Sequence, residues 1–132
     1  MLNPFPDLLT YSFFAPTLLR FAAACAFAYG AYFLWQNQKQ IGQKRFPIIG
    51  HAPWLGGAAA VAHGILAAAL AFGYHTQISA LAGALGALKG IFFAEQYREV
   101  FPFSKSTYFL LLFVLLSLLL TGAGALAKDL PL

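Results

Sequence analysis

The sequence contains very little charge. Only 9% of its 132 residues are Asp, Glu, Lys or Arg, whereas 61% are hydrophobic. A water-soluble domain of this length needs more polar side chains than that to cover its surface. The composition therefore excludes an ordinary soluble domain and indicates an integral membrane protein, whose first partner is the lipid bilayer.

Cysteine and metal-binding motifs are equally scarce. The single cysteine, Cys25, excludes an intrachain disulfide, a C-x-x-C redox motif and a thiolate metal site. No H-x-x-x-H or E-x-x-H pair is present to hold zinc or a di-iron centre. His51 and His75 each lie twelve positions from His63, about 18 Å along a helix, which is too far for a haem with two axial ligands at one depth. The sequence thus predicts no metal site and no cofactor held by the chain's own ligand motifs.

Long apolar runs are what the sequence does have. Four of them approach the ~20 residues that cross a bilayer, and none alternates as the strands of a barrel do. Nothing basic precedes the first run and no cleavage-like sequence follows it, so it is interpreted as a retained helix and not a signal peptide. The fold class predicted is all-α, an integral membrane four-helix bundle in one domain, residues 1–132. Its helices are expected at about 15–35, 52–72, 77–94 and 108–126, after a short interfacial segment at 4–14.

The basic residues predict the orientation. Five basic residues fall in the first and third predicted loops, and the second loop has none; the five are Lys39, Lys44, Arg45, Arg98 and Lys105. The positive-inside rule places those two loops in the cytoplasm, so both termini of this multi-pass protein of the cell membrane are expected outside. The net charge of +4 is then largely topological, and no nucleic-acid partner is predicted.

Small residues recur at every fourth position of the first three predicted helices. Such stripes let helix backbones approach closely. One bundle can absorb all of them, so packing within the chain is favoured, and a homo-oligomer remains the alternative. The fourth helix has no stripe in its leucine-rich centre and is expected at the lipid-facing edge. The stripes comprise Ala22, Ala26 and Gly30, then Gly56, Ala60 and Gly64, and finally Gly86 and Gly90.

Three ionisable residues lie inside the apolar runs, where charge is costly and often functional. Arg20 is near the outer end of the first helix. Snorkelling to the interface is the favoured interpretation; a pair with Asp7 or Asp129, or contact with an anionic or quinone oxygen, is the alternative. Lys89 lies near the inner end of the third helix, and snorkelling is the favoured interpretation there.

His63 sits midway along the run "AAAVAHGILAAALAFGYHTQ" and cannot snorkel. A neutral histidine that hydrogen-bonds to a neighbouring helix is the favoured interpretation, and a ligand contact or a proton-relay role is the alternative.

The blocks "LNPFPDLLTYSFFAPTLLR", "FGYHTQISAL" and "LLTGAGALAKDLPL" carry a resemblance. In order and spacing they resemble the DoxX family of small bacterial membrane proteins, over nearly the whole chain except the first loop. The resemblance implies a four-helix bundle in the bacterial inner membrane. It also implies that Arg20 matches the family's first-helix arginine, and that Gly64, Gly73, Thr76 and Gln77 match positions in the second helix and the turn.

Some members of that family are membrane subunits of quinone-linked or terminal-oxidase complexes, and others belong to assemblies for oxidative or thiol stress. The resemblance therefore implies an accessory or anchoring subunit with protein partners, with a quinone or a lipid as the ligand. The alternative is a structural or assembly protein that only fills an interface. Ala60 stands where relatives commonly have an acidic residue, and His63 where they have a glycine, so catalysis by this chain alone is the less favoured interpretation.

Overall fold

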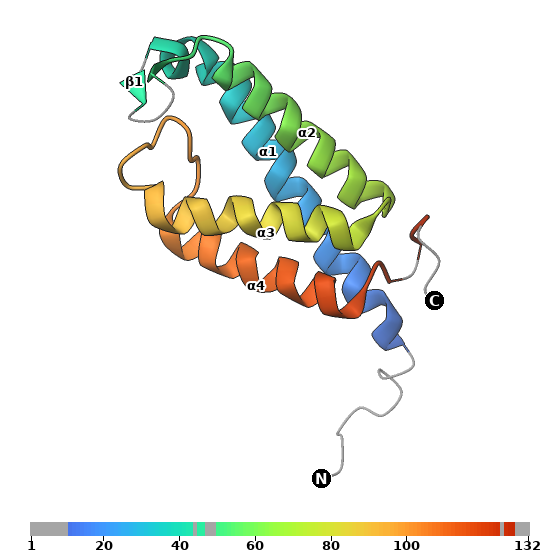
Figure 1. The fold of residues 1–132 in the computed structure, drawn as a ribbon. Coiled ribbons are helices and arrows are strands. Elements are labelled where there is room, and N and C mark those ends of the chain that lie inside the picture. The colour runs from blue at the N-terminus through green and yellow to red at the C-terminus, as the bar shows by residue number, and fades with distance from the viewer. Residues whose placement is uncertain (1–10, 44, 47–49, 125, 129–132) are drawn as a thin grey trace.

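The computed structural model describes residues 11–43, 45–46, 50–124 and 126–128. They form four helices and one small antiparallel ribbon, in which Arg45 pairs with His51 and Phe46 with Gly50. The all-α prediction is confirmed at this level, although the ribbon in the first loop was not expected. In chain order the elements are α1 (Ala15–Gln43), β1 (Arg45–Phe46), β2 (Gly50–His51), α2 (Leu55–Phe72), α3 (Thr76–Phe93) and α4 (Lys105–Thr121) (Figure 1).

Three of these helices are long and apolar enough to cross a membrane. They are α1 with its preceding turn, over Tyr11–Gln43, together with α2 and α3; α4 is also apolar but has 17 residues. The expected interfacial segment at 4–14 lies mostly outside the described residues, and 11–14 form a 3₁₀ turn that leads into α1. The chain is a helical protein with three helices of membrane-spanning length and composition.

Helix α1 is longer than the sequence predicted. It was expected to end near Trp35 and continues for about two more turns, to Gln43. The added residues, "QNQKQIGQ", include good helix formers and no proline, and Ile41 among them is buried at 1% exposure. At ~1.5 Å per residue the 29-residue helix is about 43 Å long, which exceeds the ~30 Å of a hydrocarbon core.

Some of the predicted small residues do mediate close helix contacts. A Cβ added at Gly56 of α2 would lie 2.7 Å from the Gln38 Cα of α1, and one at Gly90 of α3 would lie 2.5 Å from the Tyr108 ring of α4. The same atom at Gly64 or Gly86 would meet nothing within 4 Å. Glycine spacing therefore identified real contacts, but it also included two positions that face open space.

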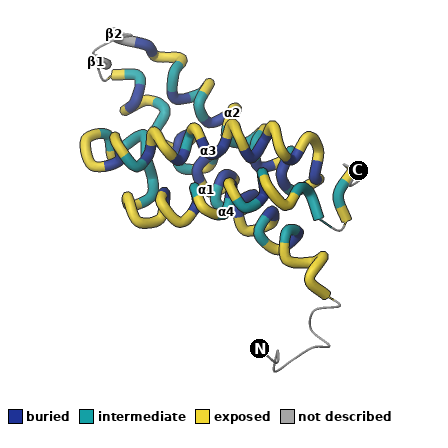
Figure 2. Tube along the Cα trace, turned by 60° about the horizontal axis from the view of Figure 1, so that its bottom comes forward, coloured by how far each residue is buried: buried dark blue, intermediate teal, exposed yellow. Residues whose placement is uncertain are grey.

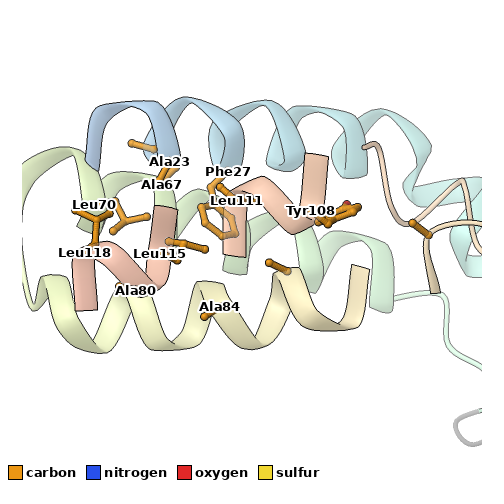
Figure 3. Packing of buried hydrophobic residues seen from close by; sticks show 13 residues of the cluster. Ala23, Phe27, Ala67, Leu70, Ala80, Ala84, Tyr108, Leu111, Leu115 and Leu118 are labelled. Atoms are coloured by element: carbon orange, nitrogen blue, oxygen red, sulfur yellow. The ribbon is translucent and has the colours of Figure 1, made fainter. Parts of the chain in front are cut away.

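Helix α4 packs one face into the core and leaves the other, which carries Leu110 and Leu120, exposed. Its expected position at a lipid-facing edge therefore stays a prediction. Leu115 and Leu118 are fully buried, and they pack with residues of the other three helices, including Phe27, Leu70 and Ala80 (Figure 3). Large side chains of α4 face glycines of α3: Leu115 lies near Gly83, and Tyr108 lies against Gly90.

The helices associate as two pairs. Helix α1 packs mainly on α2 and α3 mainly on α4, and the pairs diverge toward the end that carries the ribbon and the α3–α4 loop (Figure 1). The turn between α2 and α3 is tight, with Gly73 at φ 63° and His75 at φ 46°. However, α2 and α3 diverge from that turn and contact each other little, so they do not form a closely packed hairpin. Buried and exposed residues alternate along each helix (Figure 2). The main buried cluster draws on all four helices, and a second one, of Leu34, Ile41 and Ala60, lies between α1 and α2.

Candidate functional site

Arg20 is the most deeply buried large polar side chain among the described residues, at 0% exposure. Its guanidinium donates two hydrogen bonds to backbone carbonyls of the C-terminal segment. Nη1 lies 2.8 Å from the Ala123 oxygen, and Nη2 lies 3.3 Å from the Leu126 oxygen. These carbonyls follow the end of α4, where no further helical turn supplies donors. Arg20 therefore ties the segment that follows α4 to α1.

Three segments close around this guanidinium. A Cβ at Gly73, in the turn after α2, would lie 2.5 Å from Arg20 Nη1 and 2.6 Å from the Ala127 Cβ. The amide of Lys128 donates to the Phe72 carbonyl at 3.3 Å. Gly124 lies against Pro16 and Thr17 at the start of α1. The C-terminal segment thus covers Arg20 and excludes the snorkelling interpretation; Asp129, the proposed carboxylate partner, lies outside the described residues.

Gln77 acts at the same end of the molecule. Its Nε2 donates to the Leu119 carbonyl at 3.3 Å, in the last turn of α4. Gln77 therefore bonds a carbonyl in the last turn of α4, and Arg20 bonds carbonyls in the segment that follows it.

His63 lies near the middle of α2, about 12 Å along the axis from the start of the helix. Its Nδ1 is 2.8 Å from the Ala59 oxygen, one turn earlier in the same helix. The expected hydrogen bond to a neighbouring helix is therefore wrong. Contact with α1 is instead through packing: the His63 and Phe27 ring centroids are 5.7 Å apart, and a Cβ at Gly30 would lie 3.1 Å from His63 Cδ2.

A cavity of about 520 Å³ lies between the two helix pairs, and His63 is in its wall. Helices α1 and α2 contribute one side, and α3, α4 and the loop between them contribute the other. The wall is predominantly apolar, with polar groups from His63, Lys89, Tyr97 and Tyr108. A mostly apolar pocket with a few polar groups is typical of sites for apolar ligands.

The structure brings two of the predicted site residues together and separates them from the others. His63 and Lys89 line the same cavity from α2 and α3, whereas Arg20 and Gln77 lie toward the other end of the helices. Lys89 is exposed on the surface of α3, which agrees with a side chain that can reach the membrane–water interface.

Sequence reasoning missed the contribution of the third loop. This loop supplies the cavity with Tyr97, Val100, Phe101, Pro102 and Phe103. The signal was the aromatic-rich stretch "EQYREVFPFSKSTYF", which was interpreted only as a connection. Among the described residues, no group of three or more His, Cys, Asp or Glu side chains is placed to hold a metal ion.

Comparisons of the chain with protein-family models, with curated proteins and with solved structures returned no match. The fold and the cavity alone define the class: a small all-α protein with helices of membrane-spanning length, and an apolar cavity between its two helix pairs.

Proposed function

We propose that this chain is a DoxX-like accessory or anchoring subunit of a quinone-linked or stress-related membrane oxidoreductase complex, and that it holds a quinone-class ligand in the cavity between its helix pairs. The observation that carries the proposal is the cavity itself. Its volume of about 520 Å³ and its apolar wall suit an apolar ring with an isoprenoid or alkyl tail. Lys89 supplies a hydrogen-bond donor for one ligand oxygen.

A non-catalytic role agrees with the use of the polar side chains. Arg20 and Gln77 bond backbone carbonyls, and His63 bonds the Ala59 carbonyl of its own helix. The redox chemistry is therefore assigned to a partner protein, and the bundle supplies anchoring and a ligand site. The alternative is an assembly protein whose helices only fill an interface, and a homo-oligomer belongs to that alternative.

Gly86 offers a direct test, because it lines the cavity and faces open space. Replacing Gly86 with phenylalanine is expected to weaken binding of a decyl-substituted benzoquinone by at least about tenfold, since the new ring occupies ligand volume without clashing with the protein. Binding is measured at equilibrium with purified protein in quinone-free lipid nanodiscs.

Gly64 provides the matched control. It lies on α2, also faces open space and is outside the cavity wall. Gly64→Phe should leave the dissociation constant unchanged. Absence of quinone binding to the wild type, or equal effects of the two variants, would reject the cavity assignment and leave the interface-filling alternative.

We also propose that all four helices cross the bacterial inner membrane, with both termini outside. Helix α4 is apolar and packs beside α3 and α1. The exposed Lys39, Arg98 and Lys105 lie toward the end that carries the α3–α4 loop. In a Cys25→Ala background, cysteine at position 75 (His75→Cys) is expected to react with a membrane-impermeant thiol reagent in whole cells. Cysteine at position 96 (Gln96→Cys), past the other end of α3, should react only after lysis. The reverse pattern would overturn the orientation.

A further inference from the structure

We propose that the cavity selects ligands that donate a hydrogen bond to His63 Nε2, so that it binds the hydroquinone form in preference to the quinone. This inference rests on the proposed function for the location of the ligand, and adds which chemical form binds. It follows from the tautomer of His63, from the position of its ring in the cavity wall and from the complementary chemistry of Lys89.

The Ala59 carbonyl determines the tautomer. A carbonyl oxygen only accepts hydrogen bonds, so the contact of 2.8 Å requires the proton of a neutral His63 ring to be on Nδ1. The other nitrogen, Nε2, then carries a lone pair and acts as an acceptor. Among the described residues, no hydrogen-bond donor of the protein lies against Nε2.

The other protonation states are less favourable at this position. Moving the proton to Nε2 would place two lone pairs, those of Nδ1 and the Ala59 oxygen, against each other at 2.8 Å. Protonating both nitrogens would place a cation near the middle of a membrane-spanning helix, where charge is costly. His63 therefore presents an acceptor to the cavity.

A quinone and a hydroquinone differ at this acceptor. A quinone carbonyl facing Nε2 would leave two acceptors desolvated and unpaired, which is the kind of mismatch that binding sites discriminate against most strongly. A hydroquinone O–H donates to Nε2 and satisfies it. Lys89 can hold the second oxygen of either form, because carbonyl and hydroxyl oxygens both accept hydrogen bonds from an ammonium.

The ligands expected to bind share a hydroxyl group on an apolar molecule. Their binding can be measured with the wild-type protein, without any substitution. Under argon in quinone-free nanodiscs, decyl-hydroquinone is expected to bind about tenfold more tightly than decyl-benzoquinone and than the bis-methyl ether of the hydroquinone. A tenfold preference for the reduced form raises the midpoint potential of the bound two-electron couple by about 30 mV. Equal or tighter binding of the quinone or the ether would overturn the inference.

Two further ligands separate the possible sources of the hydroxyl. Decylphenol and decanol each carry one O–H, on a ring and on a chain respectively. Tight binding of decylphenol but not of decanol supports the hydroquinone assignment. If decanol binds as tightly as decyl-hydroquinone, the ring does not contribute to recognition, and the hydroquinone assignment fails.

His63→Leu should abolish the preference, because it removes the acceptor that the hydroquinone O–H satisfies and that the quinone carbonyl leaves unpaired. Gly86→Phe should weaken both ligands equally, because it removes volume and not the acceptor. The outcomes distinguish the two proposals. If Gly86→Phe weakens quinone binding but the wild type shows no preference for the hydroquinone, only the selectivity is rejected. Binding of neither ligand to the wild type rejects the site itself.

Discussion

Replacing Arg20 with leucine is expected to destabilise the folded protein by about 2–4 kcal/mol. The substitution removes both donors from the Ala123 and Leu126 carbonyls, which lie beyond the end of α4. Each carbonyl then loses a partly buried, charge-assisted hydrogen bond, and a bond to a charged group contributes about 1.5–3 kcal/mol. Thermal or denaturant unfolding in a mild detergent measures the loss. Hydrogen exchange at residues 122–128 should accelerate in the folded state, because the segment is released from α1.

Arg20→Lys separates the forked contact from the charge. Lysine retains the cation but not the planar arrangement that reaches two carbonyls at once, so we expect about half of the loss seen with leucine. Arg98→Leu is the control, since that arginine is exposed in the α3–α4 loop, and its effect should be within about 0.5 kcal/mol of zero. If Arg20→Lys matches the wild type in both stability and exchange, the hydrogen bonds from Arg20 to the two carbonyls do not hold the C-terminal segment in place.

Gly90→Ala is the second substitution with a large expected effect, a net loss of about 1–2 kcal/mol. A Cβ at Gly90 would lie 2.5–2.7 Å from three atoms of the Tyr108 ring, a separation that forces the ring or the helix to move. Tyr108 is buried and has little room, because Phe101 and Phe103 contact its ring edge to face at centroid distances of 5.8 and 5.6 Å. The added methyl group should therefore push α4 away from α3 at the cavity end, which unfolding in detergent will register.

Gly86→Ala is the matched control, one turn earlier on the same helix. A Cβ there meets nothing within 4 Å, so only the helix preference of alanine over glycine remains, a gain of up to about 1 kcal/mol. We therefore expect the free energy of unfolding to fall in Gly90→Ala and to rise in Gly86→Ala. Equal effects at Gly86 and Gly90 would mean that α3 and α4 do not approach each other at Gly90 as the structure shows.

Several residues of the candidate site could be predicted from the sequence, because ionisable residues are easily recognised within apolar runs. Arg20, His63 and Lys89 were identified on that basis, and Arg20 and His63 prove to have specific polar contacts. Their partners were not accessible. The carbonyls that Arg20 binds are 103 and 106 positions away, and any backbone carbonyl is chemically equivalent until the fold selects one. His63 was expected to bond another helix, yet a carbonyl one turn earlier in its own helix was within reach.

The sequence by itself determined the class of protein, the number of helices and the positions of the turns. These properties follow from local quantities: the length of apolar runs, the scarcity of charge, and Gly73 at a left-handed turn position. Only the tertiary structure decided that α2 and α3 diverge, that α4 enters the core and that a cavity lies between the helix pairs. Such features depend on which apolar faces meet, and in a chain whose helices are apolar on nearly every face the sequence does not mark the contacting one. Packing volumes over the whole bundle make that choice, through pairs such as Gly90 with Tyr108 and Gly83 with Phe27.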